Sequence, residues 1–357
     1  LNGAGGVTLG ANTEVTGTLD LSTGTLTVGA NTLTISGNNP TRNTGSINAT
    51  NSSSTVAFTN GSAITLPGGI FGGTLRNLTL NGAGGVTLGA NTEVTGTLAL
   101  TNGTLTVGGN TLTLAGTVSG SGTINATASS SIVALTGSSI TTLPSQLGTT
   151  INGLTINNGQ TVSMGSSDVI IGGNGGSLTL TSGKFSIGTS RTLTLAGTVS
   201  MNASNNLIGS STSNLAIQGS TLKTVFFDNT TAGSTNALQD LTLSSSGNVE
   251  IGSNTTANAN NQAQLYVHRT VTVGTGTTLN INNAVDKNHI ILVSDGTNQA
   301  RVANVQGSIT QGDNTKIVVE RFVNLTGGNN RAWRFVTAPL RGTGNVGSPI
   351  DRTVRFQ

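Results

Sequence analysis

The 357-residue sequence contains no cysteine, and only 3% of its residues are aromatic and 8% charged. Without cysteine, the chain can form neither a disulfide framework nor a thiolate metal site. No run of about 18 apolar residues occurs, so we expect no membrane-spanning segment. Charged residues make up roughly 25% of a typical globular domain, and we therefore expect stability to come from hydrogen bonding and packing.

Threonine, serine, asparagine and 52 glycines take the place of the missing residue types. Low charge with few large side chains could indicate disorder, but disordered chains usually combine a high net charge with few β-branched residues. In this sequence β-branched residues alternate with polar ones throughout, and strong helix formers are scarce. The pattern predicts an ordered, all-β protein with almost no helix.

The formal net charge of +3 is unevenly distributed. Residues 1–268 carry 5 Lys and Arg against 7 Asp and Glu, whereas residues 269–357 carry 10 against 5. The basic character therefore belongs to the C-terminal quarter. A nucleic-acid-binding surface needs clustered basic residues with interleaved aromatics, and since the repeats contain none, we expect no nucleic-acid partner.

An internal repeat organises the chain. The segment Leu80–Gly116 is a second copy of Leu1–Gly37, with only six differing positions out of 37. Weaker copies begin near 156 and 243, so the units start near 1, 80, 156 and 243. A long period filled with short β-type segments is typical of proteins that stack their repeats.

Within a unit, short strands of period two alternate with turns. Leu26, Val28, Leu33 and Ile35 point to one side of such strands, and the threonines between them point to the other. A β-solenoid and a string of antiparallel sandwiches with Asn-Gly hairpins both fit this pattern. We favour the solenoid, because small aliphatic side chains fill a narrow coil more easily than a sandwich core about 10 Å thick. With coils of about 20 residues, the near-identical copies would lie four coils apart.

Three segments, 38–76, 117–152 and 200–237, vary more in length, and we expect loops and bulges there. Between them they contain Pro40, Pro67, Pro144, Phe58, Phe71, Phe226 and Phe227. We expect the phenylalanines to cover local core, and a ligand-binding role is the less favoured interpretation.

The predicted solenoid domain covers residues 1–315, and residues 316–357 differ from it in amino-acid composition. This second segment is basic and holds the single tryptophan. We interpret it as a C-terminal β cap or docking segment, or as the start of a further domain. The chain begins at Leu1, inside a repeat and without methionine, so we expect a processed or partial chain.

Two phrases in the sequence resemble a known group of proteins. They are the repeat GVTLGANTEVTGTLALTNGTLTVGGNTLTLAG and the tail VERFVNLTGGNNRAWRFVTAP. Together they resemble the large, secreted, adhesin-like surface proteins of Bacteroidota, which are built from β-strand repeats and are often exported by type IX secretion. The resemblance implies an extracellular or cell-surface location.

We expect no enzyme activity and no cofactor or metal site, because catalysis requires a convergent set of polar groups. The twelve carboxylates are spread thinly along the chain. Asp168, Asp228 and Asp240 do not recur at a coil spacing, and His268 and His289 lie in β segments without an adjacent acidic cluster.

Pairs of threonines separated by one residue could form outward ladders on stacked coils. They include Thr25/Thr27, Thr32/Thr34, Thr104/Thr106, Thr111/Thr113 and Thr192/Thr194. A regular array on one flat face could order water and bind ice. The alternative is that threonine serves as a β-former that keeps the outer face soluble without charge.

The favoured function is structural: an extracellular stalk or adhesin, or the subunit of a head-to-tail filament. The predicted subunit-docking residues are Arg331, Trp333, Arg334, Phe335, Arg352 and Phe356. Surface glycans are a further possible partner. A carbohydrate-binding or carbohydrate-processing β-helix is the main alternative, and an ice-binding solenoid is a minor one.

Overall fold

The computed structural model describes residues 1–72, 74–173, 175–221, 223–252, 264–281, 289–294, 299–303, 305–311 and 316–320. These residues are nearly all β-structure, with parallel strands stacked as a β-solenoid of about 12 turns and about 22 residues per turn. The predicted solenoid is therefore confirmed. The described residues contain one short 3-10 helix, η1 (Ser145–Leu147), and no α-helix. The chain divides into two compact units, Leu1–Leu207 and Ile208–Gln357.

In the first unit the chain passes repeatedly along three sides in a fixed order, contributing parallel strands to each. The first side contains β1 (Val7–Thr8), β4 (Thr25–Thr27), β7 (Ser46–Asn48), β12 (Thr92–Val94), β15 (Thr111–Leu114), β18 (Ile132–Leu135), β20 (Gly153–Ser163), β22 (Ser177–Ser186) and β24 (Thr198–Ser200). The second side contains β2 (Thr13–Val15), β5 (Thr32–Ile35), β8 (Thr55–Phe58), β10 (Asn77–Leu80), β13 (Thr97–Leu100) and β16 (Thr117–Ser119).

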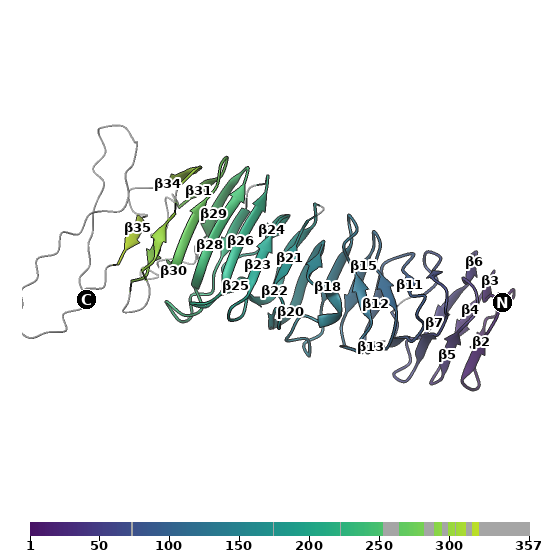
Figure 1. The fold of residues 1–357 in the computed structure, drawn as a ribbon. Helices are drawn as coiled ribbons and strands as arrows, with labels where there is room; N and C mark the ends of the chain where they lie inside the picture. The colour runs from purple at the N-terminus through teal and green to yellow at the C-terminus, as the bar shows by residue number, and fades with distance from the viewer. Residues whose placement is uncertain are drawn as a thin grey trace, which may run out of the picture. The chain divides into compact units, whose positions relative to one another are not determined.

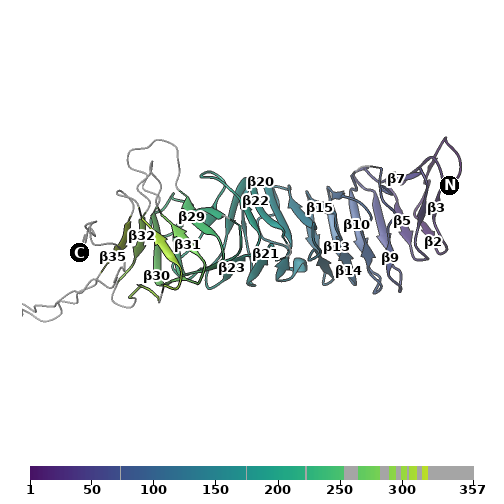
Figure 2. The same cartoon turned by 90° about the horizontal axis from the view of Figure 1, so that it is seen from above.

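The strands of the third side belong to three sheets that follow one another along the stack. It contains β3 (Asp20–Leu21), β6 (Thr41–Arg42), β9 (Ile64–Thr65), β11 (Val86–Thr87), β14 (Thr104–Thr106), β17 (Thr123–Asn125), β19 (Thr150–Ile151), β21 (Val169–Ile171) and β23 (Thr192–Leu195). Figure 1 shows the strands of this unit, coloured from purple to teal, lying one after another, and Figure 2 shows the same stack from above.

The near-identical copies do not lie four coils apart, as the sequence period predicts. Val7, Leu26, Ile47 and Phe71 occupy matching places on successive turns of the first side. The copy of Val7 is Val86, which belongs to β11 on the third side. The prediction is wrong because turns average about 22 residues rather than 20. A 79-residue period therefore ends two sides beyond a whole number of turns, and equivalent strands of the two copies lie on different sides.

The interior is filled by the aliphatic residues that the alternation predicts. On the second side, Leu33, Val56, Leu78 and Leu98 are paired in sequence from one turn to the next, and each is 0% exposed. The threonines beside them point outward and are half-buried by their neighbours. Burying each such aliphatic side chain stabilises the fold by about 1.5–3 kcal/mol.

Asparagine side chains complete the hydrogen bonding at the corners between sides. Asn77 Nδ2 donates to the Ser54 carbonyl oxygen at 2.9 Å, and Asn77 Oδ1 accepts from the Thr97 main-chain N–H at 2.9 Å. One amide thus joins three successive turns. Such partners are required because a buried main-chain group without one costs about 1–3 kcal/mol.

Glycine occupies the corners where one turn approaches the next most closely. A Cβ atom on Gly116 would overlap the carbonyl oxygen of Gly96 on the preceding turn. Gly109 has room, since the nearest atom to a Cβ there is the Ser129 carbonyl oxygen at 3.9 Å. The first copy has Ala30 at the place of Gly109 but keeps Gly37 at the place of Gly116. This agrees with the room for a Cβ atom at Gly109 and the lack of room at Gly116.

The second unit is built from two sets of parallel strands. One contains β26 (Asn214–Gly219), β28 (Ala237–Ser245), β30 (Gln264–Val273), β32 (His289–Leu292), β33 (Arg301–Val302) and β35 (Lys316–Val319). The other contains β27 (Lys223–Phe226), β29 (Asn248–Gly252), β31 (Thr278–Asn280) and β34 (Ser308–Thr310), and β25 (Leu207–Ile208) spans the division between the units. Strand β35 pairs with β32, so the parallel sheet extends past the predicted boundary at 315.

A lysine occupies an inward position in the second unit. Lys223 is 0% exposed and pairs in register with Val249, which is followed on the next turns by Leu279 and Ile309. Its ammonium group donates to the Thr221 carbonyl oxygen at 3.4 Å and to Thr221 Oγ1 at 3.3 Å. Burial lowers the pKa of Lys223 below its ordinary value, because the charged form is poorly solvated there.

We predict that Gly116→Ala destabilises the first unit by about 1–3 kcal/mol, because the added methyl group must displace the main chain of the preceding turn. Gly109→Ala is the matched control. It should leave stability unchanged or raise it by up to about 1 kcal/mol. Urea unfolding followed by far-ultraviolet circular dichroism measures both. Equal effects of the two substitutions would contradict the close contact at Gly116.

We also predict that the second unit becomes more stable as the pH rises through the folded-state pKa of Lys223 towards 10.5. The folded-state pKa of Lys223 lies below 10.5, so between the two values the unfolded chain binds more protons and stability rises with pH. Lys223→Leu, which copies the residue type at position 279, should stabilise the unit by about 1 kcal/mol or more and reduce this pH dependence. Urea unfolding at several pH values tests both effects. An unchanged pH slope in the variant would contradict the assignment.

Candidate functional site

The predicted subunit-docking residues Arg331, Trp333, Arg334, Phe335, Arg352 and Phe356 lie outside the described residues. The docking role of this segment stays a prediction. The same holds for the predicted cap from residue 321 onward.

The first turn of the first unit leaves its inward positions uncovered. Val7 is 49% exposed, whereas its copy Val86 is 2% exposed. Val86 pairs with Ile64 of the preceding turn. By contrast β1, β2 and β3 each form one end of their sheets.

The ionisable side chains considered from the sequence are engaged in separate local contacts. Asp168 Oδ1 accepts from the Thr192 main-chain N–H at 2.9 Å. Asp240 forms an ion pair with Arg269, whose Nε donates a hydrogen bond to Asp240 Oδ1 at 2.8 Å. This hydrogen bond raises the pKa of Arg269 above its ordinary value. Asp228 accepts from the Thr230 hydroxyl at 2.6 Å.

The two histidines belong to different strands. His268 lies in β30 and His289 begins β32. Within the described part of the chain, no group of three or more His, Asp or Glu side chains is placed to hold a metal ion. No described helix is long and apolar enough to cross a membrane.

The threonine ladders are distributed over all three sides of the first unit rather than on one face. Thr104 and Thr123 hydroxyls lie 2.9 Å apart on the third side, and Thr97 and Thr117 hydroxyls lie 3.3 Å apart on the second. Alanine interrupts other columns, as where Thr113 is followed in register by Ala134. A continuous flat threonine array, as the ice-binding alternative requires, is therefore not formed on these strands.

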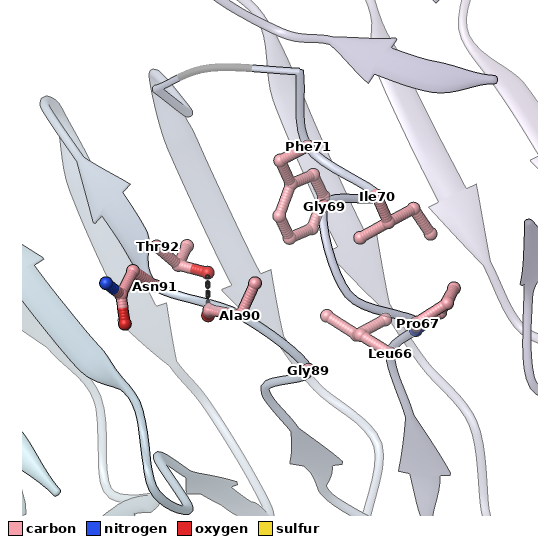
Figure 3. A pocket seen from close by; sticks show the side chains of 9 residues that line it. All are labelled: Leu66, Pro67, Gly69, Ile70, Phe71, Gly89, Ala90, Asn91 and Thr92. Carbon is pink, nitrogen blue, oxygen red and sulfur yellow. Dashed lines mark hydrogen bonds between the residues drawn. The ribbon is translucent and has the colours of Figure 1, made fainter. Parts of the chain in front are cut away.

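A hollow lies where the first side of the first unit is interrupted between β7 and β12. It is shallow and open to solvent. Two walls enclose it, as Figure 3 shows: a loop at 66–71 and a segment at 89–92. The lining residues are Leu66, Pro67, Gly69, Ile70, Phe71, Gly89, Ala90, Asn91 and Thr92.

The loop wall is fixed from several directions. The Ile70 N–H donates to the Pro67 carbonyl oxygen at 3.3 Å, and Ile70 is buried. Arg42 donates to the Gly68 carbonyl oxygen at 2.8 Å and to that of Gly45 at 2.6 Å, which ties the loop to the preceding turn. The aromatic ring of Phe71 is left half-buried at the mouth of the hollow.

The opposite wall supplies polar groups. Asn91 Oδ1 accepts from the Thr111 N–H at 2.9 Å, and the exposed Asn91 Nδ2 has no hydrogen-bond partner among the described residues. Thr92 Oγ1 donates to the Ala90 carbonyl oxygen at 3.1 Å and retains its acceptor capacity. None of the lining residues is charged.

A matched loop elsewhere in the unit shows that Phe71 is not required to close this turn. The loop at 143–148 begins with the same Leu-Pro pair as the loop at 66–71. Its Leu147 N–H donates to the Pro144 carbonyl oxygen at 3.0 Å, and Leu147 is buried like Ile70. The residue that follows is Gly148 in place of Phe71. The Pro67–Ile70 hydrogen bond therefore closes the loop without help from Phe71, which pairs with Ile47.

We expected the phenylalanines to cover local core. Phe58 is 1% exposed, as expected. Phe71 is half-buried, pairs with Ile47 on the first side and also lines the hollow.

Comparison with protein-family models, with curated proteins and with solved structures gave no match to this chain. The interpretation of its function therefore rests on its own residues and geometry.

Proposed function

We propose that this protein is an extracellular structural protein that acts as a surface stalk or adhesin, or as the subunit of a head-to-tail filament. The resemblance of its repeats to secreted Bacteroidota surface proteins supports the extracellular location. Repetitive stacking also supports a structural role, because such a protein gains length with each added turn without needing a new core.

The observation that carries the filament form of the proposal is that successive turns are joined by parallel strand pairing with the same inward and outward alternation. A second copy of this chain offers parallel strands with the same alternation, and pairing of a strand of one copy with a strand of another would be a heterologous contact. Contacts of that type produce open filaments.

A carbohydrate-binding β-helix is a second candidate. The hollow at Phe71 favours it, since it combines an aromatic ring with uncharged polar groups. The two candidates are compatible, because the hollow and the first turn involve different residues.

We predict that the 357-residue chain assembles in a concentration-dependent manner and that Val7→Asp weakens this assembly by at least about tenfold. A carboxylate at an inward position would have to be buried without a partner at the new contact. Thr8→Asp is the matched control, because Thr8 is the outward neighbour on the same strand, and it should have little effect. Light scattering over a range of concentrations and electron microscopy measure the assembly. A chain that stays monomeric at all concentrations and forms no fibres would contradict the filament proposal.

A further inference from the structure

An exposed asparagine stands directly before a glycine at the corner between β13 and β14. The side-chain oxygen Oδ1 of Asn102 accepts a hydrogen bond from the Gly103 main-chain N–H at 2.8 Å. The side-chain carbonyl carbon Cγ is bonded to that oxygen, so it lies next to the Gly103 nitrogen. A main-chain nitrogen in this place is able to attack the side-chain amide, because the two reacting atoms are already held together.

The turns on both sides hold Gly103 in its conformation. Gly103 has a φ of +76°, a left-handed conformation that glycine adopts without strain. Its carbonyl oxygen accepts from the Thr123 N–H of the following turn at 3.0 Å. A Cβ atom on Gly103 would overlap the Gly82 carbonyl oxygen of the preceding turn. Glycine is therefore required here, and it brings no side chain that could shield its own nitrogen from Asn102.

The other Asn-Gly pairs that the structure describes in the first unit lack this arrangement. Asn60 and Asn152 are buried, each 2% exposed. The amide of Asn158 donates to two main-chain carbonyl oxygens of the preceding turn, at 2.9 and 3.3 Å. Asn2 and Asn81 are exposed, but among the described residues no hydrogen bond joins either side chain to the N–H that follows it. One described pair thus combines exposure with an aligned nitrogen.

We propose that Asn102 is a site of spontaneous modification at which the side-chain amide is lost without an enzyme. The Gly103 nitrogen gives its proton to a solvent base and attacks Cγ, so that a new C–N bond forms. The side-chain nitrogen Nδ2 takes up a proton and leaves as ammonia, and a cyclic imide joins the two residues. Water then adds to one of the two ring carbonyl carbons, and the bond from that carbon to nitrogen breaks. The product is aspartate or isoaspartate, according to which bond breaks.

Either product changes a surface that is otherwise neutral. Residues 94–167 contain no Asp, Glu, Lys, Arg or His, so the new carboxylate is the one ionised side chain of this stretch. Isoaspartate also inserts a methylene group into the main chain, at a corner where the Asn102 N–H donates to the Leu80 carbonyl oxygen at 3.2 Å. We expect isoaspartate to lower stability, because the hydrogen bonds to both neighbouring turns cannot all be kept. The inference goes beyond the proposed surface role and does not depend on it.

The experiment follows the modification in the 357-residue chain by peptide mass spectrometry. The folded chain is incubated in heavy-oxygen water at several pH values, and the incorporated oxygen marks each amide lost during incubation. Electron-transfer fragmentation separates aspartate from isoaspartate. We expect Asn102 to react at least about tenfold faster than Asn60, Asn152 and Asn158, and faster than the exposed Asn81. The rate should rise with pH, because the attacking nitrogen must first lose its proton.

A substitution and a matched control separate this site from its neighbours. Asn102→Thr copies the first copy of the repeat, where Thr23 precedes Gly24 and Gly24 has the same φ of +76°. This variant should fold and should lose both the modification at this position and the fall in melting temperature that follows it. Asn81→Thr removes an exposed Asn-Gly pair of the preceding turn, and it should leave the rate at Asn102 unchanged.

Urea-unfolded chain tests whether the folded geometry, rather than the Asn-Gly sequence, sets the rates. Unfolding removes the fixed geometry of every pair, so the rates of the Asn-Gly pairs should converge. The proposal is overturned if Asn102 reacts more slowly in the folded than in the unfolded chain, if Asn81 reacts faster than Asn102 in the folded chain, or if the buried pairs react as fast as Asn102. Because these rates are measured in the unsubstituted chain, they decide the proposal even if a variant fails to fold.

Discussion

The structure depends on main-chain hydrogen bonds between one turn and the next. Parallel strands pair at a spacing of about 4.8 Å, and this short distance sets the requirements at every position of a turn. Inward residues must be aliphatic and of similar size, as Leu33, Val56 and Leu78 are. Corners must either lack a Cβ, as at Gly116, or carry a side chain that satisfies the main chain, as at Asn77. The unusual composition of the chain follows from these requirements.

The close spacing of the turns also explains why the surface has so few charged residues. Outward residues stand in columns one turn apart, where like charges would repel along the column. Threonine, serine and asparagine avoid this repulsion and can bond to one another, as Thr104 and Thr123 do. A surface built in this way has few distinctive features.

The alternation of Leu26, Val28, Leu33 and Ile35 with threonine was sufficient to predict the inward face, because period-two burial is a local property. The choice of a solenoid over stacked sandwiches needed a second argument, the small size of the inward side chains. The placement of the repeats was not predictable in this way. It depends on the length of each turn, which varies between 19 residues, as from Val7 to Leu26, and 31, as from Thr270 to Arg301. Each turn is about two residues longer than the predicted 20. Over one 79-residue repeat this excess moves the second copy to another side. The hollow at Phe71 was not predicted because its two walls, 66–71 and 89–92, come together only in the folded chain. Lys223 was missed because a lysine on a β segment normally points outward, and only the register with Val249 shows that it points inward.

The central claim is that successive turns stack in parallel and in register. Cross-linking tests it most directly, because the chain has no cysteine of its own. A variant with Thr104→Cys and Thr123→Cys places two thiols on paired positions of β14 and β17. A variant with Thr104→Cys and Asn125→Cys is two residues out of register. A disulfide requires Cα atoms within about 7 Å, so the account predicts that mild oxidation cross-links the first pair and not the second. Equal cross-linking of both pairs, or cross-linking of the second alone, would contradict it.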